Sequence, residues 1–278
     1  MFQSILFRIT WINLKSFCRI WKITLCFTVF FLICIYNRQE MNNMMYSYHK
    51  TYSYFDFAFF MLGSKYDPIH YRLLETMVMI LPYVLSSYLT AIYSLEEGIL
   101  KSYMTIPRVK SLFKWYVGHI VTLIITCSVY IVIEHICIFI VSLDLPKHVL
   151  NSDNELLPVI TNPVTTMLTV IGIQIISMLF FQILQLVITL LTQNPIYGFL
   201  FAIFSYVMVF FTNTLNAGAL KWIPGIQLIL KNNSVSSDFV NTISPSWSFM
   251  YMFILECLVI GIGWFFYNRK EKLLYKIM

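Results

Sequence analysis

The stretch SLEEGILKSYMTIPRVKSLFKWYVG, residues 94–118, joins two long apolar runs, 73–93 and 115–143. Each run is long enough to form a membrane-spanning helix. The stretch between them is basic, and the cytoplasmic loops of membrane proteins carry an excess of lysine and arginine. We therefore predict that it lies on the cytoplasmic side of a membrane. Its basic residues are Lys101, Arg108, Lys110 and Lys114.

Within this stretch, the spacing of apolar residues predicts a short helix. Ile99, Tyr103 and Ile106 stand at positions i, i+4 and i+7, so they share one helical face. Proline cannot continue a regular helix, so the chain is expected to turn at Pro107 and re-enter the bilayer. The pattern indicates a helix on the inner membrane surface, within reach of a cytoplasmic partner.

The composition of the chain is that of an integral membrane protein. Of its 278 residues 59% are hydrophobic and only 12% are charged, whereas soluble domains carry about 25% charged residues. The chain has a net charge of +6, but its basic residues nowhere form a run of five or more. This distribution favours anchoring at anionic lipid and argues against nucleic acid as a partner. The length suits one membrane domain and leaves no room for a separate soluble enzyme.

The apolar runs predict an all-α, polytopic protein that forms a single transmembrane domain, residues 1–278. Three predicted cytoplasmic segments hold four Lys or Arg each, twelve of the 19 in the chain, so both termini are predicted to be cytoplasmic. The outer segment 37–71 is expected either to line the outer mouth or, as we favour, to lie on the outer leaflet, and 217–246 is either a re-entrant hairpin or an interfacial helix. Six transmembrane helices are predicted at about residues 20–36, 73–93, 115–143, 165–192, 196–216 and 247–267.

Residues 1–22 have an amphipathic pattern. At 100° per residue, Arg8, Lys15, Arg19 and Lys22 fall within an arc of roughly 60°. This predicts an interfacial helix with its cations toward anionic headgroups. A plain cytoplasmic positive anchor before the first span explains the pattern equally well.

The chain contains no pattern typical of an enzyme. It lacks the nucleotide-binding sequence GxxxxGK[ST], the metalloprotease sequence HExxH and the esterase sequence GxSxG. Its six cysteines form no CxxC pair and have no histidine at metal-ligand spacing, so neither a metal site nor a cofactor is predicted.

Three ionisable residues fall within predicted spans. Glu134 and His135 are expected near the outer interface, where their side chains reach headgroups or water. Glu256 is predicted to lie about 14 Å deep, where a charge costs roughly 2.5–3.5 kcal/mol. We hypothesise that it faces the protein interior with a stripe of glutamines and lines a translocation path; purely structural hydrogen bonding is the alternative. The glutamines of this stripe are Gln174, Gln182 and Gln185.

The central stretch resembles the permease subunits of type-2 ABC exporters. Members of this class commonly show an acidic cluster ending in Glu-Gly, eight further residues, and a proline followed by a basic residue. Here these are Glu96-Glu97-Gly98 and Pro107-Arg108, with Gly118-His119 about two residues later than the usual Gly-Lys pair. The resemblance implies a coupling helix that docks into a separate cytoplasmic ATPase. The residues it assigns to coupling are Glu96, Glu97, Gly98, Lys101, Tyr103, Pro107 and Arg108.

The resemblance also implies a function and a set of partners. The chain would pair with a second permease subunit, identical or not, in a plasma membrane, with ATP and magnesium held by the ATPase. It would export a hydrophobic peptide, drug or lipid-like compound by alternating access. Other interpretations are a permease-like immunity or sensor protein, an ATP-independent carrier or channel, and a membrane-embedded enzyme. The bias toward Lys, Ile, Asn and Tyr hints at an AT-rich bacterial genome.

Overall fold

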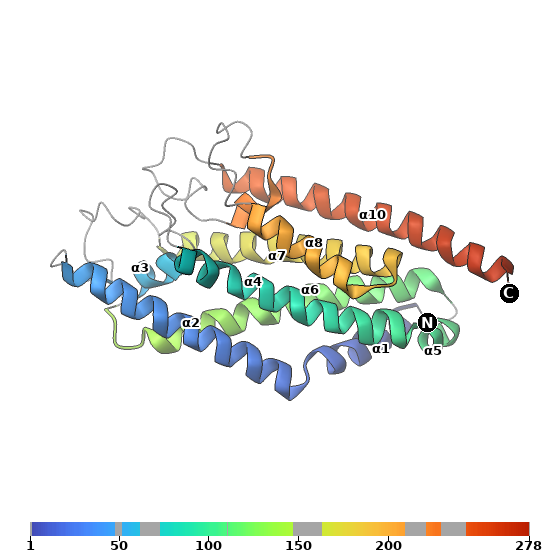
Figure 1. Cartoon of the computed structure of the whole chain (residues 1–278), viewed down its shortest axis with the longest axis horizontal. Coiled ribbons are helices and arrows are strands. Elements are labelled where there is room, and N and C mark those ends of the chain that lie inside the picture. Colours follow the sequence, from blue (N-terminus) through green and yellow to red (C-terminus); the bar gives the residue numbers. More distant parts are fainter. Residues whose placement is uncertain are drawn as a thin grey trace.

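A computed structural model describes residues 2–47, 52–61, 73–109, 111–146, 163–208, 221–228 and 243–277. Almost all of these residues are helical, and the longer helices lie side by side in one elongated bundle (Figure 1). In chain order the elements are α1 (Phe2–Phe17), α2 (Ile20–Ser47), α3 (Tyr54–Phe59), α4 (Leu73–Tyr93), the π-helix η2 (Ser94–Leu100), α5 (Ser102–Val109), α6 (Leu112–Val141), α7 (Pro163–Thr192), α8 (Pro195–Met208), the 3₁₀-helix η4 (Pro224–Leu228) and α10 (Pro245–Ile277).

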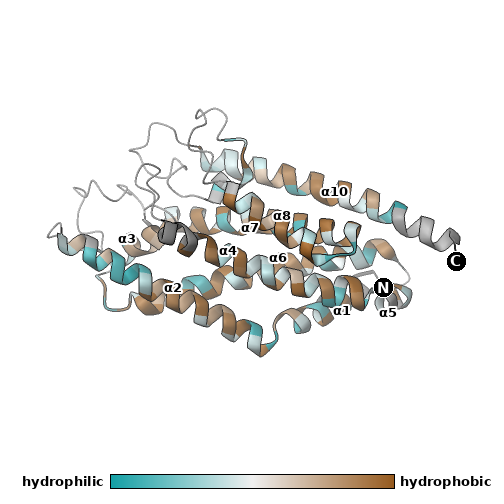
Figure 2. Ribbon diagram, viewed as in Figure 1, coloured by the Kyte–Doolittle hydropathy of each residue, from teal (hydrophilic) through white to brown (hydrophobic). Residues whose placement is uncertain are grey.

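Four helices in the described part of the chain are long and apolar enough to cross a membrane. They are Ile20–Ser47, Leu112–Val141, Val164–Thr192 and Pro245–Arg269. Two predicted spans are not among them: α4 occupies the range 73–93, and the described part of 196–216 forms the shorter α8. The apolar colour follows the middle of the bundle in Figure 2, as expected of a membrane-embedded protein.

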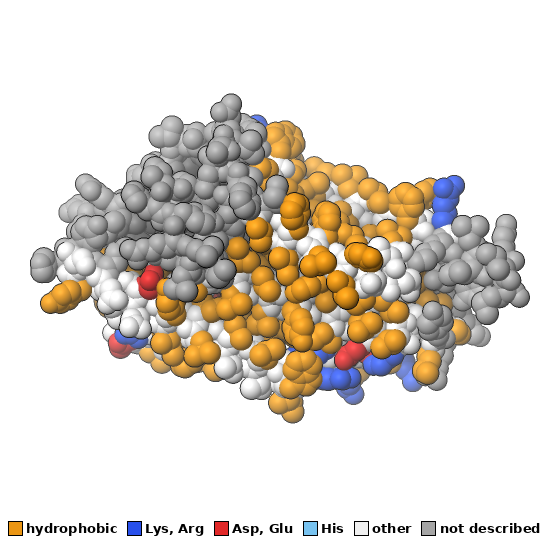
Figure 3. Space-filling model, viewed as in Figure 1, with side chains coloured by type: hydrophobic (Ala, Val, Ile, Leu, Met, Phe, Trp, Pro, Cys, Tyr) orange, Lys and Arg blue, Asp and Glu red, His pale blue; other side chains and the backbone are white. Residues whose placement is uncertain are grey.

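Helix α7 is the centre of the bundle and packs against α4, α6, α8 and α10. In the most apolar stretch of each helix, 67% of the residues are buried in α7, whereas only 17% are buried in α10. The outer helices therefore expose many apolar side chains, which are spread over the middle of the visible face in Figure 3. This surface suits a lipid environment, since soluble proteins rarely expose apolar patches of this extent.

Helix α2 does not end where its apolar run ends. The predicted end was at residue 36, but the helix continues for eleven residues to Ser47. Met41 and Met45 point inward there and are almost fully buried, so one side of a polar-looking segment still packs on the bundle. Helix α10 likewise continues through the predicted cytoplasmic tail to Ile277.

The bundle has two ends, which we name after α3 and α5 (Figure 1). At the α3 end, Arg38 donates to the Val141 carbonyl and, at 2.5 Å, to Asp144, which joins α2 to the end of α6. The Arg38 guanidinium holds the pKa of the Asp144 carboxyl below its usual value. Within the predicted outer segment, α3 buries Phe57 and Phe59 in the core of the bundle, so this part of the segment packs on the protein.

The turn between α7 and α8 is as tight as the sequence predicts. Gln193 has a left-handed backbone conformation, with φ of 58°. The Asn194 side chain accepts a hydrogen bond from the Ile196 backbone N–H at 2.9 Å. Pro195 is the first residue of α8, where its missing N–H costs nothing.

Candidate functional site

The stretch that resembles a coupling helix lies at the α5 end of the bundle. Helix α4 passes without a break into η2, where the Lys101 N–H donates to the Glu96 carbonyl, five residues earlier, at 3.1 Å. Helix α5 follows and contains Pro107. The predicted turn at Pro107 is therefore wrong, because α5 includes the proline and ends two residues later at Val109. The proline removes one hydrogen bond and crowds the carbonyl four residues earlier, and the helix ends within one turn of it. We call residues 94–109 the lever segment.

Glu96 is held by the junction between α1 and α2. Its carboxylate lies 3.6 Å from the Arg19 guanidinium and 3.7 Å from the Lys22 ammonium, and it accepts a hydrogen bond from the Ser16 hydroxyl at 3.1 Å. Lys22 also donates to the Ser16 carbonyl at 3.2 Å. We call these four residues the hinge latch. The latch joins the N-terminal junction to the lever segment.

The latch corrects the expectation for residues 1–22. They form two helices, α1 and the start of α2, with a break at residues 18–19. The Lys22 side chain is 1% exposed and faces the protein, not the anionic headgroups. Its partner Glu96 lies far away in the sequence, so helical periodicity within residues 1–22 did not reveal this contact.

Removing the Glu96 charge is expected to destabilise the protein. In Glu96→Gln the buried Lys22 ammonium loses its carboxylate, and we expect the free energy of unfolding to fall by about 1–3 kcal/mol, allowing for screening at the partly exposed Glu96. The measurement is the denaturant midpoint of the purified protein. The half-exposed Arg19 provides the control, because Arg19→Gln is expected to cost no more than about 1 kcal/mol.

A second substitution tests the cause of that loss. Adding Lys22→Met to Glu96→Gln removes the unpaired buried charge, so the double variant is expected to regain most of the lost stability. A double variant no more stable than Glu96→Gln alone would show that the ion pair is not the source of the effect.

The second carboxylate of the lever segment, Glu97, is also engaged inside the chain. Its side chain is 1% exposed and forms an ion pair with Lys101. Gly98 is buried, and a Cβ at this position would lie 3.4 Å from a methyl group of Leu190 on α7. Both predicted coupling carboxylates therefore position the lever segment within this chain.

The exposed face of the lever segment differs from the predicted one. Ile106 packs against the hydrophobic core, whereas Leu100 and Met104 are 62% and 66% exposed. Pro107 is exposed beside them. The side chains of Tyr103 and Arg108, and all of Lys110, lie outside the described residues.

An aromatic cluster, which the sequence analysis did not find, connects the lever segment to the helices around it. The Trp115 indole donates to the Thr105 hydroxyl at 3.0 Å, and its ring meets His119 edge-on with centroids 4.3 Å apart. The Tyr93 hydroxyl lies 2.5 Å from His119 Nδ1. The cluster, which joins α1, α4, α6 and α10, consists of Phe17, Tyr93, Trp115, His119 and Tyr267.

The candidate translocation residues are all buried, but they divide between two places. The amide of Gln182 donates to the Ser86 hydroxyl at 2.6 Å, and that of Gln185 donates to the Ser87 carbonyl at 2.7 Å. These glutamines of α7 therefore face α4, as part of a longer row that includes Gln174. Glu256 lies on α10, and it interacts electrostatically with Cys127 of α6.

Glu134 does not reach the outer interface as expected. Its side chain is buried on the inward face of α6, the face that also carries Cys127, Tyr130 and Cys137. Depth along the helix suggested access to headgroups, but the rotation of α6 decides which way the side chain points. His135, the next residue, is half-buried and lies 2.8 Å from the Ile131 carbonyl.

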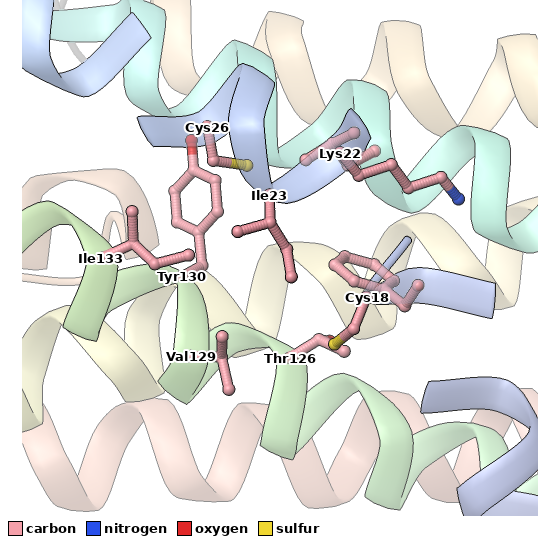
Figure 4. Close-up of a pocket in the computed structure, with 10 residues that line it drawn as sticks. Cys18, Lys22, Ile23, Cys26, Thr126, Val129, Tyr130 and Ile133 are labelled. Carbon is pink, nitrogen blue, oxygen red and sulfur yellow. The ribbon is translucent and has the colours of Figure 1, made fainter. Parts of the chain in front are cut away.

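A cavity of ≈ 20 Å³ lies beside the hinge latch, between the α1–α2 junction and α6 (Figure 4). Cys18, Cys26 and Tyr130 line it, while the Lys22 ammonium extends away from it. Its volume admits about one water molecule, which excludes an organic substrate.

Within the described residues, no group of three or more His, Cys, Asp or Glu side chains is arranged to hold a metal ion. The lever segment contacts α4, α6 and α7, so a force applied to it would reach the centre of the bundle. No protein-family model and no curated protein matches this chain.

Proposed function

We propose that this chain is the membrane-spanning subunit of an ATP-driven ABC exporter. In this proposal six helices cross the membrane, with α4 and α8 as the second and fifth spans. The α5 end and both termini face the cytoplasm of a bacterial cell, and α1 lies in the interface. A separate ATPase carries ATP and magnesium, and two permease subunits form the working unit. Hydrophobic peptides, drugs or lipid-like compounds are the proposed substrates.

The exposed apolar face of the lever segment is the observation that carries the proposal. Leu100, Met104 and Pro107 are exposed, although they lie outside the four long apolar helices. Apolar side chains exposed together outside a lipid-facing span are typical of a protein interface. Leu100 is the last residue of η2, which continues α4, and Met104 and Pro107 lie on α5, directly after the turn at Lys101.

The contacts of the lever segment supply a route for coupling. Its Thr105 hydroxyl is bonded to Trp115 of α6, and its Gly98 lies against Leu190 of α7. An ATPase that binds the lever segment differently in its ATP-bound and ATP-free states would bias these helices between two arrangements. Energy would enter the chain through that difference in binding, with no chemistry in the chain itself.

The ATPase interface is tested by placing a charge on the lever segment. We expect Met104→Asp to reduce the amount of ATPase that copurifies with the tagged chain at least tenfold, because a carboxylate replaces an apolar contact. The ATPase is identified by mass spectrometry as a copurifying subunit with the sequence GxxxxGK[ST]. Leu143 provides the matched control, since it is 64% exposed at the opposite end of the bundle.

The control variant Leu143→Asp should retain the ATPase in full. Equal retention of the ATPase by both variants would contradict docking at the lever segment. The absence of any ATPase from the unsubstituted preparation would contradict the exporter assignment as a whole.

Two buried carboxylates, Glu134 and Glu256, favour one alternative, an ATP-independent carrier. Ionisable groups buried between membrane helices are typical of ion-coupled transport. In that case Glu256→Gln would abolish transport in vesicles without ATP, whereas an exporter would show no transport until ATP is supplied.

A further inference from the structure

Two rows of polar side chains face each other in the interior of the bundle. Apart from the adjacent pair Ser86 and Ser87, the members of each row recur every three to five residues, and every member is at most 3% exposed. The row on α4 and η2 consists of Ser86, Ser87, Thr90, Ser94 and Glu97. The row on α7 consists of Gln174, Ser177, Gln182, Gln185 and Thr189. We call the two rows together the polar seam.

The seam is closed by few hydrogen bonds. The Gln182 and Gln185 amides donate across it to Ser86 and to the Ser87 carbonyl, but their own oxygens accept no hydrogen bond among the described residues. In that part of the chain, nine side-chain oxygens of the seam are buried without a hydrogen-bond partner, although the side chains of Gln174 and Ser87 also interact with the Tyr83 and Tyr206 hydroxyls. The nine oxygens belong to Ser87, Thr90, Ser94, Glu97, Gln174, Ser177, Gln182, Gln185 and Thr189.

This arrangement is unfavourable for a permanently closed interface. Most buried polar side chains in proteins have a hydrogen-bond partner, and an unpaired one destabilises the conformation that buries it. The opposite side of α7 has an apolar contact instead, since Gly172 there lies against the ring of Phe249 on α10. The polar groups of α7 therefore gather on the side toward α4, where Gln185 and Thr189 also lie against Gly198 of α8.

The seam is long enough to cross most of a membrane. From Gln174 to Thr189 the rise along α7 is about 22 Å, against roughly 30 Å for the hydrocarbon core of a bilayer. At the α5 end the seam reaches Glu97, which is part of the lever segment and is paired with Lys101 at the surface. A movement of the lever segment would reach this end of the seam directly.

We propose that the polar seam is an interface that opens: α4 and α7 separate along it, and water enters between them. The open seam is a hydrated path within one chain, lined mainly by uncharged hydroxyl and amide groups. Its chemistry suits water and uncharged solutes that form hydrogen bonds, not ions. The inference goes beyond the proposed export function, because it requires only that the chain lies in a membrane.

Thiol labelling tests the opening. In a variant without the six native cysteines, single cysteines are introduced as Thr90→Cys and Ser177→Cys, and membranes are treated with a charged, membrane-impermeant thiol reagent. The controls are Leu89→Cys and Met178→Cys, whose positions are adjacent and equally buried but face the apolar core. We expect the seam positions to react at least tenfold faster than their neighbours. Equal rates within each pair, fast or slow, would overturn the proposal.

Melting temperature provides a second test that keeps the native cysteines. Thr90→Val and Ser177→Ala remove unpaired hydroxyls from the closed state, so each is expected to raise the melting temperature. Thr122→Val is the control, because the Thr122 hydroxyl is also fully buried but donates to the Gly118 carbonyl at 2.7 Å; it is expected to lower the melting temperature. A decrease for all three variants would assign the seam a static structural role and overturn the proposal, whether or not an ATPase copurifies.

Discussion

Gly198→Ala is expected to lower the melting temperature of the protein by roughly 6–12 °C. A Cβ at this position would lie 2.5 Å from both the Gln185 carbonyl oxygen and the Thr189 hydroxyl on α7. The backbone oxygen cannot move aside without distorting α7, the most buried of the candidate membrane helices. The expected loss is about 3 kcal/mol, the upper end of overpacking costs. Thermal unfolding in detergent, followed by tryptophan fluorescence, measures the change.

Gly261→Ala is the matched control for this prediction. A Cβ at Gly261 would meet no atom of the described residues within 4 Å, and alanine is a better helix former than glycine. This variant is expected to be as stable as the unsubstituted protein or slightly more stable. Equal stability of the two variants would contradict the close approach of α8 to α7.

Glu97→Lys is expected to have the second large effect. It places an ammonium group at a position that is 1% exposed and directly beside Lys101. Breaking a fully buried ion pair costs about 3–5 kcal/mol. Solvent screening at the half-exposed Lys101 reduces this cost, whereas the buried ammonium and its repulsion from Lys101 increase it. We expect the variant to insert into the membrane, because the apolar helices are unchanged, but to unfold at a much lower temperature and to lose any ATPase bound at the lever segment.

Exchanging the two charged residues tests whether the loss of stability comes from the broken ion pair or from the loss of the Glu97 side chain itself. In Glu97→Lys with Lys101→Glu the pair is restored in reverse, so part of the stability is expected to return. The measured quantity is again the melting temperature. If Glu97→Lys alone unfolded within 1 °C of the unsubstituted protein, Glu97 would not be a buried partner of Lys101.

The helices were predictable where an apolar run is bounded by polar residues. The starts of α4, α6, α7 and α10 lie within three residues of the predicted ones, because charged residues or prolines flank these runs. The end of α2 was not predictable from hydropathy. Residues 37–47 are polar on average, and their helix depends on the burial of Met41 and Met45 by distant parts of the chain.

The position of the candidate site in the sequence was predictable, but the contacts of its side chains were not. The resemblance directs attention to residues 94–108, but it suggests that their carboxylates are free to bind a partner. The structure instead pairs Glu96 with Lys22 and Glu97 with Lys101. The first pair joins residues far apart in the sequence, and a single sequence carries no periodic signal for such a contact. The same limit explains why the aromatic cluster around Trp115 was missed.

Only one of the two rows of the polar seam was predicted from the sequence. The glutamines of α7 were predicted to share a face, but the matching row of Ser86, Thr90 and Ser94 on α4 and η2 was not predicted. Short hydroxyl side chains in an apolar helix are easily taken as neutral, since they can bond to their own backbone. Among the described residues, however, the Thr90 and Ser94 hydroxyls have no hydrogen-bond partner, and Ser86 accepts its hydrogen bond from Gln182 of α7.

The orientation of the lever segment is the central claim, and thiol accessibility tests it most directly. Single cysteines at exposed positions, Met104→Cys at the α5 end and Ser47→Cys at the α3 end, are treated with a membrane-impermeant thiol reagent in the cysteine-free background. The account predicts that Met104→Cys reacts only in inverted vesicles and Ser47→Cys only in right-side-out vesicles. Reaction of Met104→Cys in right-side-out vesicles would place the lever segment outside the cell and contradict the account.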